Sequence, residues 1–171
     1  MGEDMTLRAQ GIYKSYGDLD VLADLSVEFP AQSISCVMGP SGVGKTTLLN
    51  ILGGLIEPGA GQVSGLNEEP VSYLFQEPRL LPWKTVHGNL EFVLRGAYTH
   101  RDERSKVIAD VLGLVDMTDF AHFYPAQLSG GMKQRVSVAR AFAFPSTVLL
   151  MDEPFKALDL RLKYALMQAF L

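Results

Sequence analysis

One glycine-rich segment constrains this chain more than any other feature. Residues 39–46 read Gly-Pro-Ser-Gly-Val-Gly-Lys-Thr and fit the pattern G-x-x-x-x-G-K-[ST]. The apolar run at 34–38 predicts a buried strand before it, and the pattern at 45–52 predicts a helix after it. Glycines let the backbone curl until successive N–H groups face phosphate oxygens, and a helix start favours anions. The segment therefore predicts a phosphate-binding loop between a strand and a helix.

The loop offers the groups that a nucleoside triphosphate requires. We expect Lys45 to neutralise the outer phosphates of ATP and the Thr46 hydroxyl to reach Mg²⁺. The predicted ATP-binding residues of this segment are Gly39, Pro40, Ser41, Gly42, Val43, Gly44, Lys45, Thr46 and Thr47. The alternative is a glycine-rich turn with an incidental lysine, and the predicted strand and helix on either side favour the phosphate loop.

Two adjacent carboxylates follow a second apolar strand, predicted at 148–151. Neighbouring residues of a strand point in opposite directions, so Asp152 and Glu153 are expected to do different work. Asp152 is predicted to join Thr46 around Mg²⁺, and Glu153 to orient and polarise the attacking water. By itself such a pair is commonly a solvated turn, and its position downstream of the phosphate loop favours the catalytic interpretation.

A third segment, Leu128-Ser129-Gly130-Gly131, stands at the predicted start of a helix. A serine followed by two glycines offers a hydroxyl and unshielded N–H groups, which form a second anion site. The plain alternative is an ordinary helix cap. With this segment, one chain holds two predicted phosphate-binding ends.

Composition narrows the class of protein. The chain of 171 residues is 47% hydrophobic and 20% charged, which suits one globular domain. A net charge of -4 gives no general field for a nucleic-acid backbone, and we expect no nucleic-acid partner. The single cysteine, Cys36, excludes a disulfide framework and fits a reducing compartment. Since no run of about 18 apolar residues is present, work at a membrane needs partner subunits.

The three segments, in this order, resemble the ATPases of ABC transporters, and the resemblance covers Leu7 to Leu171. It implies an α/β fold, a P-loop NTPase (RecA-like) core with an inserted helical subdomain. The core is expected at 1–77 and 136–171, and the helical subdomain with the signature segment at 78–135.

The same resemblance implies further site residues. Gln76 is similar to the glutamine that contacts the metal and the attacking water, so it is expected to be both catalytic and metal-binding. Tyr16 is similar to the aromatic residue that stacks on adenine, although such a tyrosine could also be a half-buried core residue. Asp159 is similar to the aspartate at the seam between two copies. Ser129 and the two glycines after it are expected to bind the γ-phosphate held by the other copy.

The family's organisation implies the partners. We expect a head-to-tail dimer of this chain, transmembrane permease subunits and a solute-binding protein, with the chain peripheral on the cytoplasmic face of the cell membrane. The stretch Phe75-Gln76-Glu77-Pro78-Arg79-Leu80-Leu81-Pro82-Trp83 is similar to uptake ATPases for nitrate, sulfonate or taurine. The resemblance therefore implies import of a small solute.

The family's switch histidine lies on a strand beyond the point where this sequence ends, at Leu171. We interpret the sequence as partial, and expect weak or absent ATPase turnover from the 171 residues alone. Three alternatives stay open: a non-hydrolysing nucleotide-binding remnant, a soluble ABC ATPase outside transport, and a kinase or other P-loop enzyme. The third does not explain the segment at Ser129.

Overall fold

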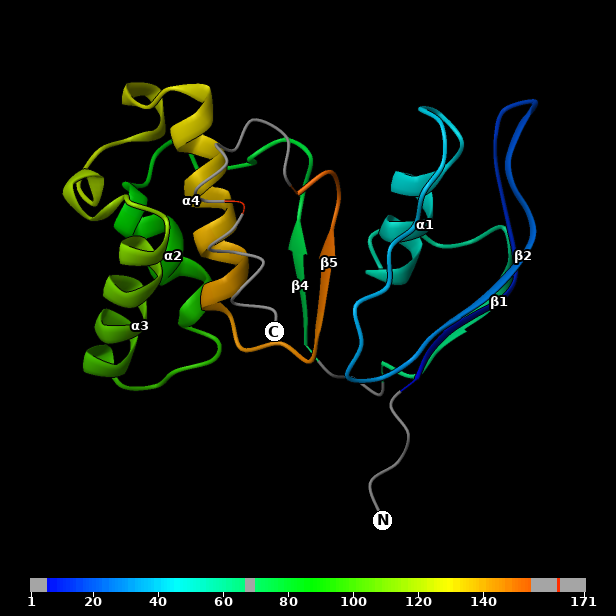
Figure 1. Ribbon diagram of the computed structural model, residues 1–171, viewed down its shortest axis with the longest axis horizontal. Helices are drawn as coiled ribbons and strands as arrows, with labels where there is room; N and C mark the ends of the chain where they lie inside the picture. The colour runs from blue at the N-terminus through cyan, green and yellow to red at the C-terminus, as the bar shows by residue number, and fades with distance from the viewer. Residues whose placement is uncertain (1–5, 67–69, 155–162, 164–171) are drawn as a thin grey trace, which may run out of the picture. The chain divides into compact units, whose positions relative to one another are not determined.

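The computed structural model describes residues 6–66, 70–154 and 163, which form two compact units that divide after Pro70 (Figure 1). The first unit contains β1 (Leu7–Tyr16), β2 (Leu19–Phe29), α1 (Lys45–Leu52) and β3 (Ala60–Ser64). The second contains β4 (Val71–Leu74), α2 (Val86–Leu94), α3 (Arg101–Leu114), the 3-10 turns η1 (Thr118–Phe120) and η2 (Pro125–Gln127), α4 (Gly130–Ala143) and β5 (Val148–Met151).

The first unit is built on an antiparallel sheet with the strand order β2-β1-β3. The alternation predicted at Leu25, Val27 and Phe29 lies on β2, where these three side chains are partly buried and their neighbours are exposed. Helix α1 spans the residues predicted for it and buries Leu48, Ile51 and Leu52. The helix that follows the phosphate loop is therefore confirmed.

The strand predicted at 34–38 is wrong. Residues 34–39 have no regular secondary structure, and Ile34 is 70% exposed. An apolar strand of this kind is buried only where strands pair with its edges and helices cover its faces. No strand of the described residues pairs with it. The phosphate loop is thus preceded by an extended segment, in which Cys36 is an exposed free thiol.

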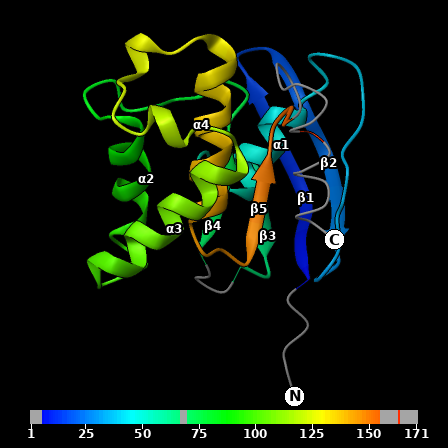
Figure 2. The same cartoon turned by 60° about the vertical axis from the view of Figure 1, so that its left-hand side comes forward.

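The second unit holds a parallel pair of strands and a group of helices. Strands β4 and β5 pair from Val71 opposite Val148 to Leu74 opposite Met151. Helices α2, α3 and α4 pack together, and α4 also contacts β4 (Figure 2). One apolar cluster joins these elements, with Leu74, Leu90 and Val136 fully buried in it. The cluster fixes the ends of β4 and β5 relative to α4.

Several predicted boundaries are close to the observed ones. Strand β5 has the predicted bounds, β4 ends one residue before Phe75, and α3 passes Gly113 by one residue. The division predicted between 135 and 136 falls within the continuous helix α4. The helix face predicted from Leu162, Leu166 and Phe170 lies outside the described residues. Within the described part of the chain, every helix is too short or too polar to cross a bilayer.

Candidate functional site

The phosphate loop has the curled backbone that its glycines predict. Gly42 and Gly44 adopt positive φ angles of 82° and 102°, a region that other residues enter only with strain. Gly44 also lies against β2, because a Cβ built on it would approach Val21 Cγ1 to 2.9 Å. Helix α1 starts directly after Gly44, with no side-chain cap and no acidic residue in its first turn. Its first N–H groups are therefore oriented to bind an anion.

Lys45 directs its ammonium group back onto this loop. Its Nζ donates hydrogen bonds to the carbonyl oxygens of Gly39 (2.9 Å) and Pro40 (2.7 Å). These bonds hold the positive charge at the curl, where the outer phosphates of a nucleotide are predicted to lie. The neighbouring Thr46 side chain is exposed in the first turn of α1.

Tyr16 is the last residue of β1 and its ring is 52% exposed. The Lys14 ammonium group lies 5.6 Å from the centre of the ring. Tyr16 thus leaves about half of its surface open to solvent. An exposed ring of this kind can stack on a flat base.

In the second unit, the ends of β4 and β5 bring three predicted site residues together. The Gln76 side chain follows β4, and its Nε2 donates a hydrogen bond of 3.0 Å to Glu153 Oε2. The Asp152 amide donates to the Leu74 carbonyl (2.9 Å), which extends the pairing one step beyond β5. Asp152 is 5% exposed, whereas Glu153 is exposed. The two carboxylates therefore lie in different surroundings, as predicted from their positions on the strand.

Glu153 has an unusual backbone. Its φ angle is 48°, in the left-handed region that non-glycine residues rarely occupy. Such a conformation costs of order 1 kcal/mol and is concentrated at functional sites. The bend turns the Glu153 carboxylate toward Gln76, where it can accept a hydrogen bond from water.

The negative charge near β4 also affects Tyr73. Burial and, to a smaller extent, the Asp152 carboxylate raise the pKa of the Tyr73 hydroxyl to about 12, while Arg79 acts in the opposite direction. The Tyr73 ring stacks on Phe75 with 4.2 Å between the ring centres. Tyr73 therefore stays uncharged at physiological pH and forms part of the wall beside the carboxylates.

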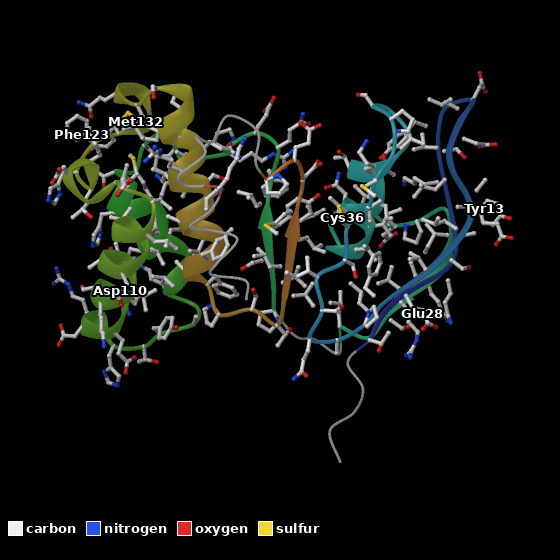
Figure 3. The ribbon with its side chains drawn as sticks, viewed as in Figure 1. Tyr13, Glu28, Cys36, Asp110, Phe123 and Met132 are labelled. Carbon is white, nitrogen blue, oxygen red and sulfur yellow. The ribbon has the colours of Figure 1, made fainter. Side chains whose placement is uncertain are left out.

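Ser129 caps α4 at the predicted start of a helix. Its Oγ accepts a hydrogen bond of 3.3 Å from the amide of Met132, which lies in the first turn of the helix (Figure 3). Both Ser129 and Gly130 are exposed, and a Cβ built on Gly130 would meet nothing within 4 Å. Gly131, the next residue, is partly buried. The start of α4 is thus an accessible helix N-terminus.

The donors predicted for a metal fit Mg²⁺. They are the Thr46 hydroxyl, the Gln76 amide oxygen and the Asp152 carboxylate, which are the oxygen ligands that Mg²⁺ prefers. Among the described residues, no group of three or more His, Cys, Asp and Glu could enclose a metal without other ligands. Mg²⁺ is characteristically held by one or two carboxylates together with substrate phosphates. The residues therefore suit Mg²⁺ bound together with ATP. Asp159 lies outside the described residues.

Sequence reasoning missed two side chains near this site, Asn89 and Arg140. Asn89 is fully buried on α2, and Arg140 is partly buried on α4, where burial lowers the pKa of its guanidinium. Both donate to backbone carbonyls of the segment that follows Gln76. A signal was present, because each polar residue occupies an apolar stripe of a helix: Asn89 follows Val86 by three residues, and Arg140 follows Val136 by four.

Known proteins resemble this chain over most of its length. The family model described as ABC transporter matches residues 22–156. The taurine import ATP-binding protein TauB of Pseudomonas fluorescens is 45% identical over 146 residues, which are 81% of this chain and 55% of that protein. The aliphatic sulfonates import ATP-binding protein SsuB 1 of Mesorhizobium japonicum is 44% identical over 154 residues, 88% of this chain and 58% of that protein. The chain thus spans little more than half the length of these relatives.

Solved structures agree as well. The dimeric structure of a bacterial ABC transporter cassette has a TM-score of 0.87 and 30% identity, and the likeness covers 95% of this chain and 80% of that one. A post-hydrolysis state of that ATP-binding cassette, bound to ADP and Pi, gives the same values. The fold is therefore the P-loop NTPase fold of ABC cassettes, and the chain belongs to the ABC transporter family.

Proposed function

We propose that this chain binds and hydrolyses ATP to power solute import by an ABC transporter. The observation that carries the proposal is the hydrogen bond of 3.0 Å between Gln76 and Glu153 at the ends of two parallel strands. It places an amide and an exposed carboxylate side by side, next to the buried Asp152. The same chain holds a phosphate loop, and a carboxylate pair of this kind acts on the phosphate group that such a loop binds.

Each residue has a defined task in the proposed reaction, which transfers the γ-phosphoryl group of ATP to water. The backbone N–H groups between Gly39 and Thr47, of which Pro40 has none, and the Lys45 ammonium group hold the phosphates and balance their charge. Glu153 orients the attacking water as a hydrogen-bond acceptor, and Gln76 fixes the direction of that carboxylate. Thr46, Gln76 and Asp152 hold Mg²⁺, which neutralises charge on the outer phosphates when bound.

The proposed partners complete the site and the transport cycle. A second copy contributes Ser129, Gly130 and Gly131 to the γ-phosphate, Tyr16 stacks on adenine, and Asp159 lies at the seam between the copies. Permease subunits contact the surface from Gln76 to Trp83, so the chain is peripheral on the cytoplasmic face of the membrane. A solute-binding protein delivers the solute. The names of the relatives favour taurine or another sulfonate as the solute.

We propose for this chain the domain organisation that the resemblance to the family implies. Residues 1–77 and 136–171 form the ATP-binding core, and residues 78–135 form the helical subdomain. The apolar cluster that joins β4 to α2, α3 and α4 supports a helical body in direct contact with the Gln76 strand.

Replacing the proposed catalytic carboxylate tests the function. In Glu153→Gln, we expect phosphate release from MgATP to fall at least about hundredfold, because a positioned acid–base group contributes that much or more. ATP binding is retained, so the variant accumulates as an ATP-bound dimer in size-exclusion chromatography with light scattering. Glu103→Gln, on the exposed first turn of α3, is the matched control and keeps wild-type release.

Two results would contradict the proposal. One is phosphate release by Glu153→Gln equal to that of a wild-type protein that itself releases phosphate from MgATP. The other is an ATP-bound variant that stays monomeric at every protein concentration. Either result would favour the alternative that Glu153 is part of a solvated turn at the end of the strand.

A further inference from the structure

The segment from Gln76 to Trp83, here called the connector, is exposed at both ends. Gln76 is exposed, and Trp83 is 71% exposed. Gln76 is held by its hydrogen bond to Glu153, and Leu80 packs on the apolar cluster of the second unit. Between these points, two side chains from two different helices hold the backbone of the connector by hydrogen bonds.

Arg140 of α4 holds the first half of the connector. Its Nη1 donates to the Arg79 carbonyl (2.9 Å) and its Nη2 donates to the Pro78 carbonyl (3.1 Å). Arg79 has a φ angle of 43°, so its backbone is strained, and its own guanidinium lies 4.1 Å from the centre of the Phe75 ring. The planar fork of Arg140 suits two adjacent carbonyls, and one guanidinium thus holds the strained bend in place.

Asn89 of α2 holds the second half. Its Oδ1 accepts from the Leu81 amide (2.7 Å), and its Nδ2 donates to the Leu81 carbonyl (3.2 Å). The same Nδ2 also donates to the carbonyls of Lys84 (3.2 Å) and Thr85 (2.9 Å), directly after the connector. Asn89 is fully buried, so these bonds are made away from water. Removing a buried partner leaves backbone groups unsatisfied, which is costly.

We infer that Arg140 and Asn89 are positioning residues that make the connector rigid, so that a displacement of Gln76 is passed to Trp83. The inference deepens the proposed function and rests on it for the role of Gln76. Arg140 also belongs to the helix that begins at Ser129. Movement of α4 and movement of Gln76 are therefore coupled through one guanidinium.

Amide hydrogen exchange followed by mass spectrometry tests the rigidity on the full chain. In Arg140→Met and in Asn89→Leu, we expect exchange across 77–85 to rise at least about tenfold, because each variant frees a strained or buried stretch of backbone. Exchange in α3 changes by less than about twofold, since its helical bonds are untouched. Arg140→Lys, which keeps the charge and one donor, restores part of the protection and serves if the methionine variant fails to fold.

Arg135→Met is the matched control. Arg135 lies on the same helix and also donates to a backbone carbonyl, that of Val115, at 3.0 Å. Its loss should raise exchange at 113–117 and leave 77–85 unchanged. The inference is overturned if Arg140→Met and Asn89→Leu leave 77–85 protected, or if all three variants raise exchange equally over the whole chain.

Trp83 reports on the transmission, because it is the only tryptophan of the chain. Its acrylamide quenching is measured with and without MgATP, and MgATP affinity is measured separately by calorimetry. We expect MgATP to change the quenching of the wild-type protein. In Arg140→Met and Asn89→Leu this change should be lost, while affinity stays within about threefold, since neither residue belongs to the proposed ATP site.

The outcomes separate the inference from the proposed function. A wild-type protein that binds no MgATP contradicts the proposed function, and the exchange experiment still decides whether the connector is rigid. A wild-type protein that binds MgATP without any change at Trp83 overturns the transmission. A full Trp83 response in both variants overturns it as well.

Discussion

The Lys45 ammonium group donates hydrogen bonds to carbonyl oxygens of its own loop, those of Gly39 and Pro40. Phosphate oxygens are stronger acceptors than carbonyls for an ammonium group, so a nucleotide should take over these bonds. We predict that Lys45→Met lowers MgATP affinity at least about tenfold, the usual effect of losing a hydrogen bond to a charged group. Calorimetry measures it, with Lys106→Met on the exposed face of α3 as the control. Equal affinity of the two variants would refute the role of Lys45.

The site residues differ in how far sequence could predict them. Asp152 and Glu153 are predicted from their positions at the end of a strand to point in opposite directions, and the structure has Asp152 buried and Glu153 exposed. Their separate roles stay predictions. The contact between Gln76 and Glu153 spans 77 positions of the chain, and only a resemblance to a family placed Gln76 at the site. Asn89 stands out in the sequence as a polar residue in an apolar helical stripe, but that pattern does not reveal which loop backbone its side chain bonds.

The phosphate loop allows a prediction at the scale of one element. Gly42→Ala and Gly44→Ala both force a side chain into the left-handed region, at a cost of about 1–2 kcal/mol. A Cβ at position 42 meets nothing within 4 Å, whereas one at 44 approaches Val21 Cγ1 to 2.9 Å and the Val21 carbonyl oxygen to 3.2 Å. Gly44→Ala should therefore lose a further 1–3 kcal/mol or so through overpacking.

Urea unfolding of the first unit, followed by circular dichroism, measures the difference between these two glycine variants. Gly42→Ala is the matched control because it has the strain without the close contact. Equal unfolding free energies for the two would mean that Gly44 does not need to lie against β2.

A comparison of two helix caps distinguishes an effect on stability from an effect on function. The Thr85 and Ser129 side chains each accept a bond from the backbone three residues on, at 3.1 Å from Gly88 and 3.3 Å from Met132. Thr85→Ala and Ser129→Ala should each lose about 1 kcal/mol of stability, the usual value of a cap. Only Ser129→Ala should also weaken the ATP-dependent dimer, measured by analytical ultracentrifugation. An equal effect on the dimer from both variants would reduce Ser129 to an ordinary cap.

The elements whose ends are marked by local sequence signals were predicted well. The strand predicted at 34–38, which would need partner strands, was not formed. Helix α1 and strand β5 have the predicted bounds, because glycines and apolar periodicity mark their ends in the sequence. The run at 34–38 has the composition of a buried strand, yet these residues form no strand. Strand formation needs neighbours, and no described strand pairs with this run.

At the scale of the whole molecule, the proposed ATP site is shared by two copies of the chain. The phosphate loop belongs to the first unit, and the helix start at Ser129 belongs to the second. Each offers N–H groups at a helix N-terminus. Two such helix ends in one chain can bind two separate anions or a single shared anion. The proposal assigns them to one ATP held between a loop of one copy and a helix of the other, so ATP binding and association of the copies become the same event.

Crosslinking between copies measures this assignment most directly. In the Cys36→Ser and Glu153→Gln background, one tagged copy carries Val43→Cys on the exposed face of the loop, and a second, differently tagged copy carries Ala126→Cys just before Ser129. We predict that a short bismaleimide joins the two copies only when MgATP is present. A crosslink between the copies that forms equally without nucleotide, or its absence when MgATP is bound, would contradict this assignment.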